Sequence, residues 1–170
     1  PVKHPPRLAN VMAALAAAAV LAMIRPAIAT NYYVEVTGTD AVSVAGISLT
    51  NAWRTIGYAL RNSGPNDTIR IGAGTFPEWV VISNSVTLLG SDIYHSSNAP
   101  LQKHQSLTIL TPPTNIYSES PFVDVYTGNV SLLNLTINGD SDGNGTSDAK
   151  AGIESPYRPL TVSNCVMANL

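Results

Sequence analysis

The feature that most constrains this chain is an internal repeat towards its C-terminal end. Four apolar residues and one asparagine recur with a constant offset of 30 positions. The corresponding pairs are Val130 and Leu160, Leu132 and Val162, Leu135 and Cys165, Ile137 and Met167, and Asn134 and Asn164. A repeat of this kind is typical of solenoids, because one short unit cannot bury its apolar face alone and must stack on its neighbours. The repeat therefore predicts stacked coils of short strands that share one apolar interior.

The repeat extends backwards less regularly. Segment 139–148 looks inserted, and without about eight of its residues a coil has about 22 residues. Val86 and Leu88 precede Val130 and Leu132 by 44 positions, a spacing that we interpret as two such coils. At each corner an asparagine tolerates left-handed backbone, and its amide is expected to bond to the equivalent asparagine one coil away.

The local patterns predict one helix followed by strands and turns. Helical spacing of apolar residues over 56–62, with Thr55 as N-cap and Gly64-Pro65 as the stop, indicates a short helix that covers the open N-terminal end of the stack. Alternating segments predict strands at 31–36, 68–71, 76–82, 86–89, 106–110, 122–126, 130–137 and 160–167.

Residues 1–29 have the pattern of a secretory signal peptide. Lys3 and Arg7 form a basic start, residues 11–24 are apolar, and Ala27-Ile28-Ala29 is a small-x-small cleavage site before Thr30. As a helix the apolar run would be about 21 Å long, short of the ~30 Å hydrocarbon core of a membrane. An uncleaved membrane anchor is the alternative. No later segment is apolar enough to span a bilayer.

The predicted organisation is a signal peptide at 1–29, an N-terminal strand, loop and capping helix at 30–66, and parallel β-helix coils at 67–170 that are incomplete at the C-terminus.

Beyond residue 29 the sequence contains only six basic residues but all eleven acidic ones. This balance argues against a nucleic-acid partner or a polybasic membrane-surface protein, both of which need clustered Lys and Arg. A surface rich in Ser, Thr and Asn instead favours a polyhydroxylated partner.

A series of short motifs runs through residues 32–90. They are Tyr33-Val34, Gly38-Thr-Asp40, Trp53-Arg-Thr-Ile56, Ala59-Leu60, Asp67-Thr-Ile-Arg-Ile71, Gly74-Thr-Phe76, Glu78 and Val86-Thr-Leu-Leu-Gly90. The series resembles the N-terminal end of proteins of the pectin-lyase-like superfamily. Within that superfamily it most resembles extracellular repeat proteins. Pectin methylesterases have a similar N-terminal motif series. Asn66, where Gly is usual, and Phe76, where Tyr is usual, depart from the pattern. The resemblance implies an all-β fold, a right-handed parallel β-helix or solenoid.

One loop has the spacing of a calcium site. Asp140, Asp142, Asn144 and Asp148 stand at positions 1, 3, 5 and 9, with glycine at position 6, and a hard cation requires several such oxygen ligands and a sharp turn. Position 12 is Ala151 instead of a bidentate Glu, so the loop is not an EF-hand. Two interpretations stay open: a calcium site, or a solvated Asp/Asn/Gly loop.

No catalytic residue is assigned, because the sequence contains no recognisable acid, base or nucleophile constellation. We interpret Asp124 and Arg158 as solvated surface residues, His95 and His104 as surface-loop histidines, and Cys165 as an apolar filler.

Scattered aromatic residues could stack on sugar rings, but are equally ordinary in an extracellular β protein. They are Trp79, Tyr94, Tyr117, Tyr126 and Tyr157.

The predicted function is that of an exported module of the cell envelope or surface, with polysaccharide as its partner. Its predicted location is secreted, periplasmic or at the cell surface. The alternative is the N-terminal part of a polysaccharide lyase or esterase. The resemblance implies that its active site would lie several coils from the cap, beyond residue 170.

Overall fold

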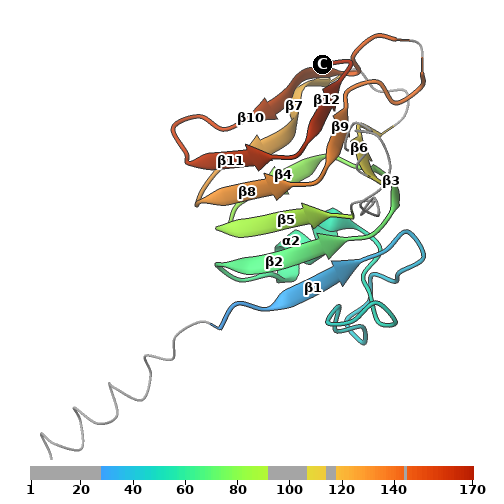
Figure 1. Ribbon diagram of the computed structural model, residues 1–170, viewed down its shortest axis with the longest axis vertical. Coiled ribbons are helices and arrows are strands. Elements are labelled where there is room, and N and C mark those ends of the chain that lie inside the picture. Colours follow the sequence, from blue (N-terminus) through green and yellow to red (C-terminus); the bar gives the residue numbers. More distant parts are fainter. Residues whose placement is uncertain (1–27, 92–106, 114–117, 144) are drawn as a thin grey trace, which may run out of the picture.

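The computed structural model describes residues 28–91, 107–113, 118–143 and 145–170 (Figure 1). Nearly all of the predicted signal peptide lies outside these residues, and so do His95, His104, Tyr94, Tyr117 and Asn144. The described part is dominated by β-strands and has one short helix. The elements are β1 (Asn31–Val34), α2 (Ile56–Asn62), β2 (Asp67–Ile71), β3 (Gly74–Pro77), β4 (Val80–Ile82), β5 (Val86–Gly90), β6 (Thr108–Thr111), β7 (Ser118–Val125), β8 (Val130–Leu133), β9 (Thr136–Asn138), β10 (Ala149–Glu154), β11 (Leu160–Ser163) and β12 (Val166–Ala168).

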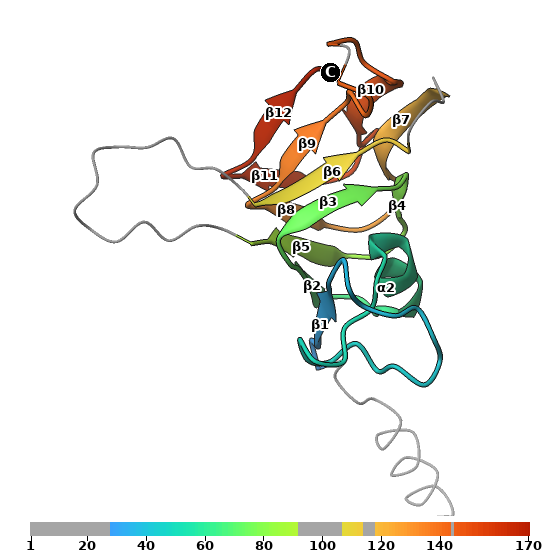
Figure 2. The ribbon, with the colours of Figure 1, turned by 90° about the vertical axis from the view of Figure 1, so that its right-hand side faces the viewer.

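The strands form three sheets in which every neighbouring pair is parallel. Their orders are β1-β2-β5-β8-β11, β3-β6-β9-β12 and β4-β7-β10. From β2 onward the chain adds a strand to the first, second and third sheet in turn, and each circuit stacks on the previous one (Figures 1 and 2). This arrangement is compatible with a β-helix or solenoid.

The repeat with an offset of 30 is confirmed as a stacking register. Leu160 pairs with Val130 and Val162 with Leu132 between β11 and β8, and Met167 pairs with Ile137 between β12 and β9. Val130, Leu132, Leu135 and Ile137 are all buried in one apolar core that runs through the coils. Alternation along each strand therefore sends these side chains into a common interior.

The corner asparagines behave as the sequence predicts. Asn134 and Asn164 have φ values of 57° and 54°, and the Nδ2 of Asn164 donates to the Oδ1 of Asn134 at 2.8 Å. Asn138 and Asn169 form a second such pair at 3.0 Å. Side-chain amides thus connect the last two coils outside the apolar interior.

The interpretation of the 44-residue spacing as two coils is wrong. Leu88 pairs directly with Leu132, because β5 and β8 are adjacent strands of the first sheet. The 44 residues form a single circuit, enlarged by the segment between Ser91 and Leu107. Circuit length varies widely, since β2 and β5 pair Asp67 with Val86, only 19 positions apart.

The helix occurs at the predicted residues. Thr55 is its N-cap, with the Oγ1 accepting the N–H of Tyr58 at 3.2 Å. The buried face of Ile56, Ala59 and Leu60 packs against β1, β2 and β4, at the β1 end of the stack (Figure 2). Trp53 is buried beside the helix and stacks on Tyr32 with ring centroids 4.9 Å apart.

Several strand predictions differ from the structure. The predicted strand 76–82 is divided into β3 and β4, because Glu78 and Trp79 form a corner between the second and third sheets. The predicted strands 130–137 and 160–167 are likewise divided at their corner asparagines. β10 was not predicted: its sequence Ala-Lys-Ala-Gly-Ile-Glu lacks a clear alternation, and it pairs with β7 through an irregular register.

Candidate functional site

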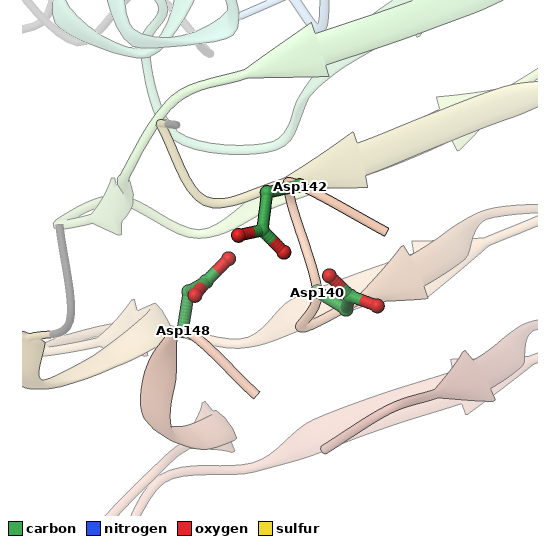
Figure 3. A group of neighbouring side chains, drawn as sticks. All are labelled: Asp140, Asp142 and Asp148. Atoms are coloured by element: carbon green, nitrogen blue, oxygen red, sulfur yellow. The ribbon is translucent and has the colours of Figure 1, made fainter. Parts of the chain in front are cut away.

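The loop after β9 brings three of the four predicted metal ligands together. One ligand atom from each of Asp140, Asp142 and Asp148 lies within 4.8 Å of the others. Figure 3 shows the carboxylates of Asp142 and Asp148 directed towards each other, with that of Asp140 beside them. Asp140 is buried, whereas Asp142 is exposed. Such a group could hold a hard cation through carboxylate oxygens.

The same carboxylates also organise the loop backbone. The two oxygens of Asp140 accept the N–H groups of Gly143 and Gly145, each at 2.7 Å. The Oδ2 of Asp148 accepts the N–H of Ser141 at 2.8 Å and its hydroxyl at 2.5 Å. Gly143 and Gly145 have φ values of 78° and 85°, conformations that glycine adopts at little cost. These hydrogen bonds connect both carboxylates to other residues of the loop, and its metal binding stays a prediction.

A second candidate site is a groove on the outer surface of the first sheet. Its volume is about 640 Å³, and it lies where β1, β2 and β5 end. Tyr33, Arg70 and Leu89 occupy one register row across these strands and line the groove. Glu35, Ser91 and Asn134, which follow β1, β5 and β8, line it as well.

The groove combines opposite charges with apolar surface. Arg70 is exposed, and its Nε donates to the Oδ1 of Asn31 at 3.1 Å, an interaction that orients the guanidinium along the sheet. The Glu35 carboxylate lies directly against Gly72. A Cβ atom added to this glycine would be only 2.2 Å from the Oε2 of Glu35. A guanidinium supplies donors and a carboxylate supplies acceptors, while Tyr33 and Leu89 supply surface that can contact a sugar ring.

Sequence reasoning missed this groove because its residues come from different circuits. Tyr33, Arg70 and Leu89 form no local motif, and they become neighbours only through strand register. The signal that could have found them is the outward-facing residue just before the last residue of each strand, compared between the paired strands.

The third sheet carries a smaller polar group on its outer face. Asp124 of β7 is the register partner of Glu154 of β10. A hydrogen bond to Asp124 and the negative charge of that carboxylate raise the pKa of the Tyr126 hydroxyl above its ordinary value. The Nε of Arg158 donates to the backbone carbonyl of Tyr126 at 3.1 Å. The structure therefore brings Glu154 beside Asp124 and Arg158 beside Tyr126, two contacts between residues that share no local sequence motif.

The other singled-out residues have ordinary environments. Trp79 packs edge-on against Phe122, with centroids 6.1 Å apart, while Tyr157 is 99% exposed. Cys165 is half-buried against the apolar core, and its thiol donates to the carbonyl of Leu132 at 3.4 Å, which agrees with its predicted role as a filler.

No protein-family model, curated protein or solved structure matches this chain. Among the described residues, no helix combines the length and the apolar character needed to cross a bilayer.

Proposed function

We propose that this chain folds as an exported right-handed parallel β-helix of the pectin-lyase-like type, and that it binds polysaccharide at the cell envelope or surface. The parallel sheets, stacked in register, are what such a fold requires. The motif series over residues 32–90 supports the family, and the leader pattern of residues 1–29 supports export.

The groove across β1, β2 and β5 is the observation that carries the binding proposal. Its volume of about 640 Å³ falls within the range of small-molecule sites. A sugar unit presents hydroxyls around an apolar ring face, and the groove offers Arg70 as donor, Glu35 as acceptor and the Tyr33 ring as a contact surface.

A row of hydroxyl side chains continues from the groove along the same sheet. Thr68, Thr87, Ser131 and Thr161 are register partners on successive strands, at the strand spacing of about 4.8 Å. Alternation places them on the outer face, because their neighbours Ile69, Leu88 and Leu132 are buried. An extended polymer crossing the strands would meet a hydroxyl at every step.

The test is affinity electrophoresis of the exported protein through gels that contain a soluble xylan or a soluble polyuronate. We expect retardation by one of these polymers, and Arg70→Ala and Tyr33→Ala to weaken it by about tenfold, as for the loss of one charged hydrogen bond or one aromatic contact. Arg61→Ala, which removes an exposed arginine of α2 outside the groove, is the matched control. Equal retardation of all variants would refute the groove as the binding site.

The alternative function, a polysaccharide lyase or esterase, has one observation in its favour. Asp124 and Glu154 are carboxylates at register positions on one face, with Arg158 bonded to the neighbouring Tyr126. Release of reducing ends or of ester methanol from a polysaccharide, lost in Asp124→Asn, would support this alternative over the binding module.

A further inference from the structure

Among the described residues, the first sheet contact is made at Thr30. The Thr30 carbonyl accepts the N–H of Thr68 at 2.9 Å, one step before the register of β1 and β2 begins. Ile28 and Ala29 are exposed and outside any regular element. Within residues 28–91, the first sheet contact therefore falls on the residue that directly follows the small-x-small pattern Ala27-Ile28-Ala29.

The backbone nitrogen of Thr30 lies against a buried carboxylate. It donates to the Oδ1 of Asp67 at 2.7 Å, and Asp67 is only 5% exposed. The Oδ2 of Asp67 accepts the N–H of Gly64 at 2.6 Å. In the described part of the chain both hydrogen-bond partners of this carboxylate are therefore neutral amides, and burying a carboxylate without a cation is costly.

We propose that cleavage of the Ala29–Thr30 bond creates an N-terminal ammonium that forms a partly buried ion pair with Asp67 and so locks the mature fold. The inference rests on the proposed export. A leader peptidase of the host hydrolyses the bond: water supplies the oxygen of the new Ala29 carboxylate, and the released Thr30 amine takes up a proton. The same nitrogen, 2.7 Å from the Oδ1 of Asp67, then carries a full positive charge.

The charge environment of Thr30 favours this role. Asp67 is its nearest charged partner on β2, and Arg70 on the same strand is bonded to the side chain of Asn31 instead. The connecting turn 64–66 carries no charge. On α2, Arg61 lies over the ring of Tyr58, 5.7 Å from its centroid. Cleavage thus supplies the cation that the Asp67 carboxylate lacks.

The first test is the mass of the exported protein. The full chain, with a start codon added, is expressed in a secreting host, and the protein recovered outside the cytoplasm is weighed intact. We expect the mass of a chain that begins at Thr30. Retention of the whole chain in the cytoplasm would refute the export proposal together with this inference, whereas export with cleavage at another bond would refute the inference alone.

The second test measures the α-amine directly. After reductive methylation with ¹³C-formaldehyde, the NMR shift of the α-amine is followed with pH in the folded and in the urea-unfolded protein. An ordinary α-amino pKa is about 7.7–8.0, and a carboxylate at contact distance should raise the folded value by about one unit or more. The same pKa in both states would overturn the inference, and this measurement needs no variant.

Variants give an independent readout of the ion pair. A raised ammonium pKa contributes stability below the unfolded pKa that is lost as pH rises through the folded pKa. A one-unit shift makes the unfolding equilibrium constant about tenfold smaller at pH 6 than at pH 9.5. We expect Asp67→Asn to remove this pH dependence. Asp40→Asn, which removes another carboxylate bonded to backbone N–H groups, should retain it; equal slopes in both variants would overturn the inference.

Discussion

One register row through the first sheet allows the stacking to be tested quantitatively. Ile69, Leu88, Leu132 and Val162 are successive register partners on β2, β5, β8 and β11. Leu88 and Leu132 are fully buried, whereas Val162, on the edge strand of the sheet formed by the described residues, is 41% exposed. If side chains of successive coils share one interior, the cost of truncation should depend on how many neighbours in this row surround a residue.

The expected magnitudes follow from this burial. Leu88→Ala removes a side chain enclosed between Ile69 and Leu132, so it should cost about 3–5 kcal/mol of unfolding free energy, near the upper end for buried leucines. Leu132→Ala, with the exposed Val162 as one neighbour, should cost about 2–4 kcal/mol because the cavity can partly collapse. Val162→Ala removes two methyl groups that are only partly buried, so it should lower the free energy of unfolding by about 1 kcal/mol.

Urea unfolding followed by far-UV circular dichroism measures these differences. Leu89→Ala and Leu133→Ala are matched controls, because both residues face outward on the same strands and are only partly buried; each should cost under about 1 kcal/mol. If Leu133→Ala proved as costly as Leu132→Ala, or Val162→Ala as costly as Leu88→Ala, the shared interior would be refuted.

Two further predictions concern single carboxylates. Burial raises the pKa of Glu78 above its ordinary value of 4.5, although hydrogen bonds from the backbone N–H groups of Gly57 and Ile56 oppose the shift. The folded protein therefore holds the Glu78 proton more tightly than the unfolded chain does. The free energy of unfolding should consequently fall as the pH rises from about 4.5 through the folded pKa. Urea midpoints measured across this interval should change less in Glu78→Gln, and an unchanged slope would contradict the assignment. For the loop after β9, we expect calorimetric titration of the protein with calcium to release or absorb heat. Asp142→Ala, which removes an exposed carboxylate, should abolish this heat. Absence of heat in the unaltered protein would contradict the calcium site and leave the loop as a turn held by its own hydrogen bonds.

The sequence predicted those features whose signals are local or strictly repeated. Helix α2 was found at its observed residues because Thr55 caps it and Gly64-Pro65 ends it. The pairing of β8 with β11 was found because the offset is constant. The pairing of β5 with β8 was misread because this single circuit spans 44 positions, which is twice the coil of about 22 residues that the repeat suggested. β10 was missed because its position is set by pairing with β7, which no local pattern records.

The candidate site was harder to predict than the core for a related reason. Inward residues are constrained on every coil by the same packing requirement, so they repeat and can be recognised. Outward residues have no such common requirement, and Tyr33, Arg70 and Leu89 are different in kind although they share one register row. The loop carboxylates were predictable because Asp140, Asp142 and Asp148 lie within one short segment.

The unequal circuits show which free-energy term determines the register. In the first sheet, paired residues are 19 positions apart between β2 and β5, and 30 positions apart between β8 and β11. Between β5 and β8 the offset is 44 positions, as for Leu88 and Leu132. Doubling the length of a flexible loop costs only about 0.6 kcal/mol in closure entropy, whereas displacing one buried leucine from the shared interior costs about 2–5 kcal/mol. A one-residue slip would turn the whole inward row outward, so extra residues are accommodated between strands rather than within them. Circuits of different length can therefore share one register without altering the interior that holds the coils together.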